Sequence, residues 1–253
     1  MKITQKKFQL GFGLILLASI VALALLNSAP APVHGFQAPL THQQKASKAG
    51  NHYHFFHKNT AKAVFTNERP AKTDRTVLIS IAAAFTKLDD NAIEGVYGIN
   101  GELHNTKAVS NRVGGLFVIH PDGHCSIEGT KMGKAINKKF LKPYAQEGYS
   151  VFQQIKIISD GAAAGFKDES KFQRRALALD KSGALSIVES VEAITLAQFA
   201  SDLVELGVHN AAYTDMGAWD EGWYRDAHGR AKTLGKDRSQ TARQSNWLVF
   251  KTP

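Results

Sequence analysis

The chain has 253 residues, enough for one large domain or two small ones, and 43% of them are hydrophobic, as expected of a protein with a buried core. Its formal net charge of +9 is concentrated at one end, because residues 1–75 carry ten of the 31 Lys and Arg residues but only two acidic ones. The rest of the chain is nearly neutral, which excludes a domain-wide electrostatic surface for DNA or RNA. The single cysteine, Cys125, excludes an intrachain disulfide, and its place in an expected hairpin favours a buried structural thiol.

The N-terminal residues have the pattern of a membrane-targeting segment. Three lysines within the first seven residues precede an uncharged apolar run over residues 10–26. A run of this length fits a cleaved signal peptide or, extended to residues 8–26, a retained anchor. Pro32 directly follows an Ala-Pro-Ala site and disfavours cleavage, so the anchor is preferred. Because the lysines stay in the cytoplasm, the protein is expected on the exported, periplasmic or extracellular side of the membrane.

Composition divides the chain into three parts. We expect a signal anchor or signal peptide over residues 1–27, a flexible stalk over 28–74 and a folded domain over 75–253. The stalk prediction depends on a composition rich in Ala, Pro, Gln, His, Lys and Asn without a sustained period. Three histidines in this part suggest a metal site, but no Cys or carboxylate accompanies them, which favours a polar linker. They are His52, His54 and His57.

The remaining elements follow from apolar patterns bounded by turn residues. Asn100-Gly101 ends one alternating run, and Pro121-Asp122-Gly123 supplies the turn of a hairpin. The run at 75–86 contains three consecutive alanines and also fits a short helix. We predict strands over 75–86, 93–101, 149–161, 208–214 and 246–251, and hairpins over 114–129 and 176–188.

Residues 195–206 form the clearest helical pattern. Thr195 can cap the N-terminus, apolar residues recur at helical spacing, and Gly207 follows as a C-terminal glycine. A strand ending at Asp215 comes next, and a carboxylate at the tip of such a strand is a ligand-site geometry of α/β folds. The predicted class is therefore α+β or mixed α/β: a β-rich single domain with hairpins and a packed helix, preceded by the N-terminal membrane segment.

Three places stand out as candidate site positions: Asn100 with its neighbour Glu102, the pair Arg174-Arg175 at the start of a strand, and Asp215 before a loop rich in aromatic residues. Each has a simpler structural explanation. Asn-Gly is commonly a turn, an arginine pair at a strand start is commonly solvated, and an aspartate after a strand is commonly a cap. Spacing alone therefore assigns no function to any of them.

Taken together and in order, these motifs resemble the phosphodiester glycosidase family, exported enzymes related to the "uncovering" enzyme that removes N-acetylglucosamine from a phosphodiester. The resemblance covers roughly residues 75–250. It rests on an Asn-Gly segment, an Arg-Ala strand, and a helix with Phe-Ala that leads into a strand ending in Asp-Gly-Gly. Asn100, one of Arg174 and Arg175 (the latter precedes Ala176 directly), and Asp215 fit the family positions. The sequence departs from the family at Thr-Asp-Met-Gly over 214–217 and in the Trp-rich loop that follows.

The resemblance implies hydrolysis of a sugar 1-phosphodiester in the cell envelope. Asp215 would be the catalytic carboxylate, Arg175 or Arg174 would clamp the departing phosphate, and Asn100 would position the substrate. The second carboxylate stays open among Glu102, Asp220 and Glu221. Aromatic faces suit the C–H patches of a sugar, although the same rings can simply cover the core. The expected substrate-binding residues are Glu102, Gln154, Gly217, Trp219, Trp223 and Tyr224, with Gln153 as a further candidate.

The sequence requires no cofactor and leaves a divalent cation open. A zinc site at His120, His124 and Cys125 lacks an evident fourth ligand, so no metal site is predicted. The expected partners are a glycan or sugar-phosphate substrate and the membrane, through the N-terminal segment, with no nucleic acid. The alternative function, from a different class, is a non-catalytic glycan-binding or structural module of the cell envelope.

Overall fold

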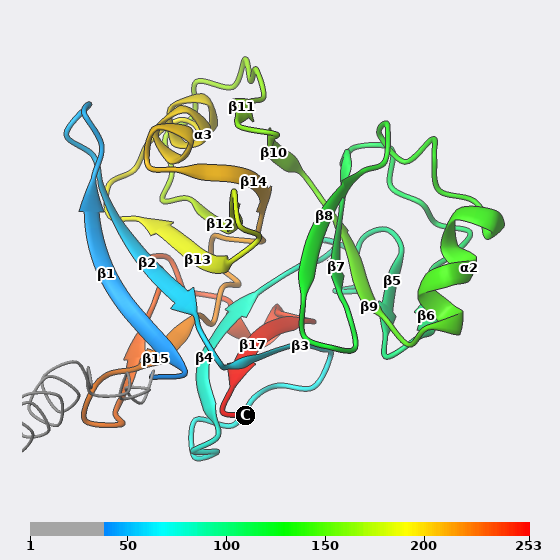
Figure 1. Cartoon of the computed structure of the whole chain (residues 1–253), viewed down its shortest axis with the longest axis horizontal. Helices are drawn as coiled ribbons and strands as arrows, with labels where there is room; N and C mark the ends of the chain where they lie inside the picture. The colour runs from blue at the N-terminus through cyan, green and yellow to red at the C-terminus, as the bar shows by residue number, and fades with distance from the viewer. Residues whose placement is uncertain (1–37) are drawn as a thin grey trace, which may run out of the picture. The chain divides into compact units, whose positions relative to one another are not determined.

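Three antiparallel sheets make up residues 38–253, the part of the chain that the structure, a computed structural model, describes (Figure 1). The first sheet contains seven strands in the order β1 (Leu40–Ala46), β2 (His52–Lys58), β13 (Leu185–Ser190), β12 (Arg175–Asp180), β14 (Val208–Tyr213), β10 (Lys156–Ser159) and β11 (Ala162–Ala163). The second contains β16 (Ala231–Thr233), β15 (Trp223–Arg225), β4 (Val77–Ala82), β17 (Trp247–Lys251) and β3 (Lys62–Thr66). The third contains β6 (Glu102–His104), β5 (Tyr97–Ile99), β9 (Ser150–Gln154), β7 (Gly115–Ile119) and β8 (Cys125–Gly129).

The predicted α+β or mixed α/β class is wrong, because every paired strand is antiparallel and the described residues contain only two α-helices, α2 (Lys138–Gln146) and α3 (Leu196–Glu205), with one short 3-10 helix. The strand–helix–strand unit read from the sequence does exist, since α3 connects β13 to β14. These two strands run in the same direction, but β12 lies between them and is antiparallel to both. The sheet therefore gains a crossover helix without any parallel pairing.

The helix expected over 195–206 occurs as α3. The hydroxyl of Thr195 accepts a hydrogen bond from the backbone N–H of Gln198 at 3.1 Å, and Gly207 follows in the left-handed region with φ of 93°. Its apolar face is buried against the first sheet. Helix α2 was not predicted, because Pro143 lies inside it and only Leu141 and Tyr144 are buried.

The stalk prediction is wrong for residues 38–74, which contribute the strands β1, β2 and β3. Histidines alternate along β2 with the buried rings of Tyr53 and Phe55, and Phe56 on the opposite face is buried in the main core. The polar composition therefore conceals a strand with buried rings on both faces. Both β2 and β3 pair with strands from the second half of the chain. Residues 38–253 form one compact unit, and the domain therefore begins well before residue 75.

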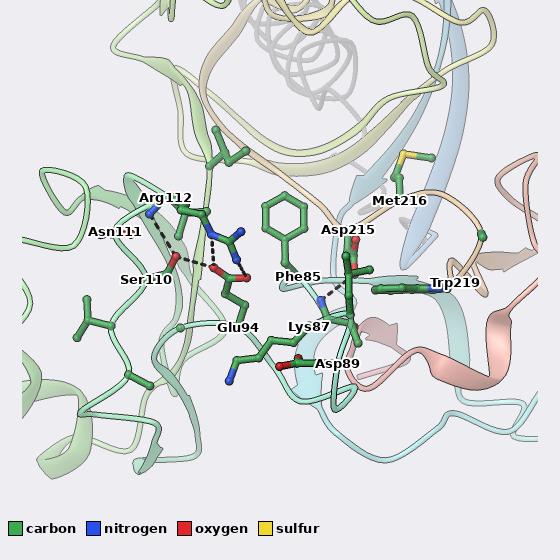
Figure 2. A pocket seen from close by; sticks show the side chains of 18 residues that line it. Phe85, Lys87, Asp89, Glu94, Ser110, Asn111, Arg112, Asp215, Met216 and Trp219 are labelled. Carbon is green, nitrogen blue, oxygen red and sulfur yellow. Dashed lines mark hydrogen bonds and ion pairs between the residues drawn. The ribbon is translucent and has the colours of Figure 1, made fainter. Parts of the chain in front are cut away.

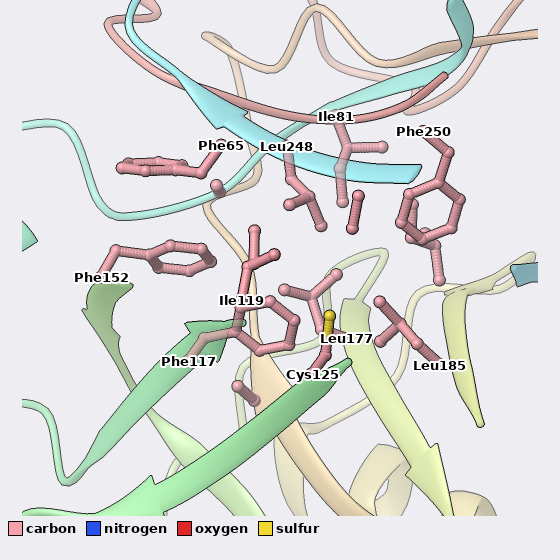
Figure 3. Packing of buried hydrophobic residues seen from close by; sticks show 14 of the residues in the cluster. Phe65, Ile81, Phe117, Ile119, Cys125, Phe152, Leu177, Leu185, Leu248 and Phe250 are labelled. Atoms are coloured by element: carbon pink, nitrogen blue, oxygen red, sulfur yellow. The ribbon is translucent and has the colours of Figure 1, made fainter. Parts of the chain in front are cut away.

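The main core lies where side chains from the three sheets meet (Figure 3). Phe65 from β3 in the second sheet packs on Phe152 from β9 in the third, with ring centroids 4.7 Å apart. Leu177 from β12 joins them from the first sheet, and Leu248 comes from β17, the neighbour of β3. Cys125 is buried in this cluster, and burial raises the pKa of its thiol to about 12. This confirms the expected structural thiol.

The strand predicted over 149–161 is two strands, β9 and β10, separated at Ile155. The chain passes there from the third sheet to the first (Figure 1). Ile155 at this crossing lies in the wall of a cavity of about 1020 Å³.

The predicted membrane segment, residues 8–26, lies outside the described residues. Between residues 38 and 253, no helix has the length and apolar character needed to span a bilayer.

Candidate functional site

A cavity of about 1020 Å³ opens beside the end of β14 (Figure 2). Three loop segments form its wall: 85–95, which follows β4; 108–113, which precedes β7; and 215–219, which follows β14. Glu94 and Arg112 lie on one side of the view and Asp215 and Trp219 on the other, with Phe85 between them.

Asp215 lies in this wall with 8% of its surface exposed. Its backbone N–H donates to the carbonyl of Ala83 at 3.1 Å, and its Oδ2 accepts from the backbone N–H of Thr86 at 3.0 Å. Burial raises the pKa of this carboxyl from its ordinary 3.8 to about 7, and the negative charge of Asp220 acts in the same direction. The hydrogen bonds from Thr86 oppose the shift without cancelling it. Asp215 is therefore a carboxyl that changes charge near neutral pH at the edge of a cavity.

The segment after Thr86 folds back on itself and carries a second carboxylate. Thr86 and Ile93 form an isolated antiparallel bridge, and the N–H of Glu94 donates to the carbonyl of Phe85 at 2.7 Å. A further bond joins the N–H of Lys87 to the carbonyl of Ala92. The same short loop thus holds Asp215 at one end and presents Glu94 at the other.

Glu94 orients an exposed arginine. Its Oε1 accepts from Ser110 Oγ at 2.8 Å and from Arg112 Nε at 3.0 Å, while Oε2 accepts from Arg112 Nη2. Burial alone would raise the pKa of Glu94, but the bonds from Arg112 and Ser110 outweigh it and keep the pKa below its usual value. The Arg112 side chain is 75% exposed, and its Nη1 has no hydrogen-bond partner among the described residues. A fixed guanidinium with a free edge therefore faces the cavity.

The buried side chain of Gln153 connects the chain segment that carries Glu94 to the segment that carries Ser110 and Arg112. Its Oε1 accepts from the N–H groups of Val96 at 2.9 Å and Ser110 at 3.0 Å, and its Nε2 donates to the carbonyl of Ser110 at 3.1 Å. Gly95 lies against it with φ of 77°, and a Cβ there would sit 2.6 Å from Gln153 Oε1. Only a glycine permits this close approach. Gln153 thus fixes the Glu94 and Ser110 segments relative to each other.

Trp219 is fixed from outside the cavity. Its Nε1 donates to Gln240 Oε1 at 3.2 Å, and the guanidinium of Arg243 lies 4.7 Å from its ring centroid. Trp219 is the one predicted aromatic contact that lines this cavity.

Arg175 does not fit the predicted phosphate clamp. It is fully buried, its Nε and Nη2 bond to Glu189, and its Nη1 and Nη2 bond to Asp220 at 2.8 Å each. Burial alone would lower the pKa of Arg175, but Asp220 and Glu189 hold it above its usual value. Two carboxylates already neutralise the guanidinium, so it has little capacity for a phosphate. Asp220, a candidate second carboxylate, belongs to the same buried cluster.

Arg174 is also occupied by the protein. Its Nη2 donates to the carbonyl of Ser170 at 2.7 Å and its Nε to that of Ile194 at 3.1 Å. Its side chain links the segment before β12 to the residues that precede α3, and it does not line the cavity.

Asn100 lies in the turn between β5 and β6, away from Asp215. Its φ of 50° is the left-handed conformation of an Asn-Gly turn, and its N–H donates to Ser150 Oγ at 2.9 Å. It lines a separate hollow of about 220 Å³ with Lys62 and His120. Glu102 is exposed on β6 next to His104, at 3.7 Å. The structure therefore does not bring Asn100, the arginine pair and Asp215 into one cleft.

The other predicted binding residues have structural positions. Gln154 is buried and donates to the carbonyl of Ala83 at 3.0 Å. Trp223 is buried in a small cluster with Trp247. Tyr224 packs on Phe56 with ring centroids 4.9 Å apart. None of these side chains lines the cavity.

Gly217 and Glu221 also lie outside the cavity wall. Gly217 has φ of 110°, a conformation that favours glycine, whereas Met216 has no such requirement and lines the cavity. This explains how the first glycine of the family pattern can be replaced and the second retained. Glu221 pairs with Arg69 at 3.3 Å.

Sequence reasoning missed Glu94, Ser110 and Arg112. One signal was available: Glu94 is a charged residue inside an otherwise apolar run, Ile93 to Val96. No group of three or more metal-ligating side chains occurs within residues 38–253, and the histidines His120 and His124 meet only edge to face at 5.3 Å.

No family model matches the sequence, and no curated protein matches it. Among solved structures, the chain is similar to the catalytic domain of zebrafish N-acetylglucosamine-1-phosphodiester alpha-N-acetylglucosaminidase, auto-inhibited by its pro-peptide, with a TM-score of 0.61 and 13% identity over 87% of this chain and 85% of that chain. It is also similar to a hypothetical protein from Synechocystis, with a TM-score of 0.52 and 14% identity over 89% of this chain and 64% of that chain. At sequence identities this low, the structural similarity shows a shared fold and nothing about activity. The chain therefore shares a distant fold relationship with a phosphodiester glycosidase catalytic domain.

Proposed function

We propose that the cavity hydrolyses a sugar 1-phosphodiester, with Asp215 as the acid–base group and Arg112 as the phosphate contact. One observation carries the proposal: a carboxyl with a pKa of about 7 lines the same cavity as an exposed, oriented guanidinium. The distant fold likeness to a glycosidase catalytic domain supports the same chemistry. The cell envelope is the proposed location, as the N-terminal sequence predicts.

Asp215 suits the activation of water. A general base works best when its pKa lies near the operating pH, and burial brings this carboxyl there. The ionised carboxylate takes a proton from water while the water oxygen bonds to the anomeric carbon. The bond between that carbon and the phosphate oxygen breaks, and the phosphate monoester leaves with the electron pair. A phosphate is already a fair leaving group, so this step needs little acid assistance.

Arg112 takes the role that the sequence assigned to Arg175. A phosphate contact needs a permanent positive charge and directed N–H donors, and an arginine supplies both. Glu94, which also accepts from Ser110 Oγ, binds Nε and Nη2 of the guanidinium and leaves Nη1 for a phosphate oxygen. Lys87 lines the same cavity and adds a second positive charge. Both oxygens of Glu94 are hydrogen-bonded, which suits a positioning role more than attack on the sugar.

Trp219 and Phe85 can receive the sugar. Both rings line the cavity, and aromatic faces pack well on the C–H side of a pyranose. Neither Asn100 nor Arg175 is available for this purpose, which leaves sugar recognition to the residues of the cavity itself.

The second candidate function is a non-catalytic glycan-binding or structural module. The observation that favours it is the absence of Asn100 and the arginine pair from the cavity, together with Met216 at the first glycine of the family pattern. Such a module would bind a sugar phosphodiester and release it unchanged.

The test uses residues 38–253, the compact unit, with a panel of sugar 1-phosphodiesters and with a chelator present or absent. We expect release of free sugar, and loss of release in Asp215→Asn. Asp160→Asn is the matched control, because Asp160 is an exposed aspartate outside the cavity. Binding without release from any member of the panel would favour the module, and an undiminished rate in Asp215→Asn would refute the assignment of the base.

A further inference from the structure

The cavity has an apolar wall next to its charged one. Five charged residues line it: the cations Lys87 and Arg112 and the carboxyl groups of Asp89, Glu94 and Asp215. The apolar members come from all three loop segments and from the crossing between β9 and β10. They are Phe85, Leu88, Ala108, Val109, Val113, Ile155, Met216 and Ala218. A surface of this kind is suited to a molecule that is anionic at one end and apolar at the other.

Leu88 extends the apolar wall to the mouth of the cavity. It is 75% exposed and is one of three large hydrophobic side chains that residues 38–253 leave exposed. Arg243 holds its loop in place, because Nη2 donates to the carbonyl of Leu88 and Nε donates to Asn91 Oδ1 at 2.9 Å. The same guanidinium covers the ring of Trp219. One arginine thus fixes an exposed leucine and a tryptophan on the same rim.

The volume of the cavity leaves space for a group besides the sugar phosphate. Pockets for drug-sized ligands span roughly 300–1,000 Å³, so this cavity of about 1020 Å³ exceeds the needs of a sugar phosphate alone. Much of the lining is apolar, so the second group on the phosphate has room in the cavity beside side chains that cannot hydrogen-bond to it.

We infer that the alcohol esterified to the phosphate, on the side away from the sugar, is apolar and contacts Leu88. The inference rests on the proposed function for the identity of the reaction, and it narrows the substrate class to sugar 1-phosphodiesters of apolar alcohols. Lys87 and Arg112 hold the phosphate, and the alkyl group follows the wall outward to the rim. A polar alcohol such as glycerol or a second sugar would lose its water of hydration there without compensation.

The first test measures binding without chemistry, with residues 38–253 and two probes, octyl phosphate and glycerol phosphate. Each buried methylene contributes about a fourfold factor, so octyl phosphate should bind at least about tenfold more tightly. Leu88→Ser should reduce that preference about threefold or more. Phe172→Ser is the matched control, since Phe172 is also exposed but lies outside the cavity. Equal binding of the two probes, or equal loss in both variants, would overturn the inference.

The second test measures hydrolysis of an octyl and a glyceryl diester of the same sugar 1-phosphate. We expect a higher kcat/KM for the octyl diester, reduced in Leu88→Ser. Hydrolysis of both diesters at equal rates refutes the apolar alcohol but leaves the proposed function intact. A preference for octyl phosphate in binding with no hydrolysis of either diester refutes the reaction instead. If residues 38–253 dimerise and Leu88→Ser abolishes the dimer, a second copy occupies this rim and the inference is wrong.

Discussion

The backbone N–H of Thr86 donates a hydrogen bond to Oδ2 of Asp215 at 3.0 Å and so joins the loop after β4 to the end of β14. The two residues are far apart in the sequence and belong to segments that follow strands of different sheets. The same loop returns through the bridge between Thr86 and Ile93 and ends at Glu94. This backbone contact therefore connects Asp215 and Glu94 through one loop.

Replacing Asp215 by Asn should stabilise the protein at neutral pH. The pKa of Asp215 is raised on folding from 3.8 to about 7. Below pH 3.8 both states hold the proton; between pH 3.8 and 7 the unfolded chain releases it more readily, so the folded state loses stability as the pH rises. The loss is complete above pH 7 and reaches at most about 4 kcal/mol. Denaturant unfolding of both proteins at several pH values should show the variant gaining stability relative to the wild type up to pH 7. A constant difference would contradict the raised pKa.

Arg112→Lys should raise KM for a sugar 1-phosphodiester about tenfold or more, because a lysine cannot keep the two-point contact with Glu94 and still present a directed N–H to phosphate. The fold should be unaffected, since the Arg112 side chain is largely exposed and such pairs contribute little stability. Arg230→Lys is the control, because Arg230 forms a similar pair with Asp226 outside the cavity. Steady-state kinetics measures KM for both variants. An equal change of KM in Arg112→Lys and Arg230→Lys would refute the phosphate contact.

Gln153→Leu should destabilise the protein by about 3 kcal/mol and also raise KM. The leucine fills the space but leaves the N–H of Val96 and both backbone groups of Ser110 without partners. The Ser110 segment then moves, and with it the hydrogen bond that orients Glu94. Thermal unfolding and kinetics on the same samples measure both effects. Tyr53→Phe, which removes a buried hydrogen bond outside the cavity, should lower stability and leave KM unchanged.

A chain of residues 75–253 should fail to fold, whereas residues 38–253 should fold. Deleting β1 to β3 removes one of the two neighbouring strands of β13 and of β17 and leaves each with an unpaired edge. It also removes three of the hydrogen bonds to the buried carboxylate of Asp202, which come from Ser47, Asn51 and Tyr53. Circular dichroism and proton NMR of the two chains provide the comparison. A folded 75–253 chain would restore the predicted stalk.

Local signals predicted the elements whose stability is local. Helix α3 followed from the cap at Thr195 and its apolar spacing, and the β12–β13 hairpin followed from its turn at Asp180 to Gly183. Asp215 at the tip of a strand was also visible, because a turn residue ends an apolar run. These features depend on neighbours within a few residues.

The remaining features depend on contacts that spacing does not reveal. Arg175 looked like a free cation because its partners, Glu189 and Asp220, are 14 and 45 residues away. Arg112 looked unremarkable because Glu94 reaches it only through the Thr86 loop and the amide of Gln153. The polar composition of β2 concealed its buried rings, since a strand needs only every second residue to be apolar.

The rate of sugar release as a function of pH tests the central claim most directly. With residues 38–253 and a sugar 1-phosphodiester as substrate, kcat should rise as the pH passes through about 7, because only the ionised carboxyl of Asp215 accepts a proton from water. Asp215→Asn should show no release at any pH. A rate that is flat across this range in the wild type, or that persists in the variant, would contradict the role of Asp215.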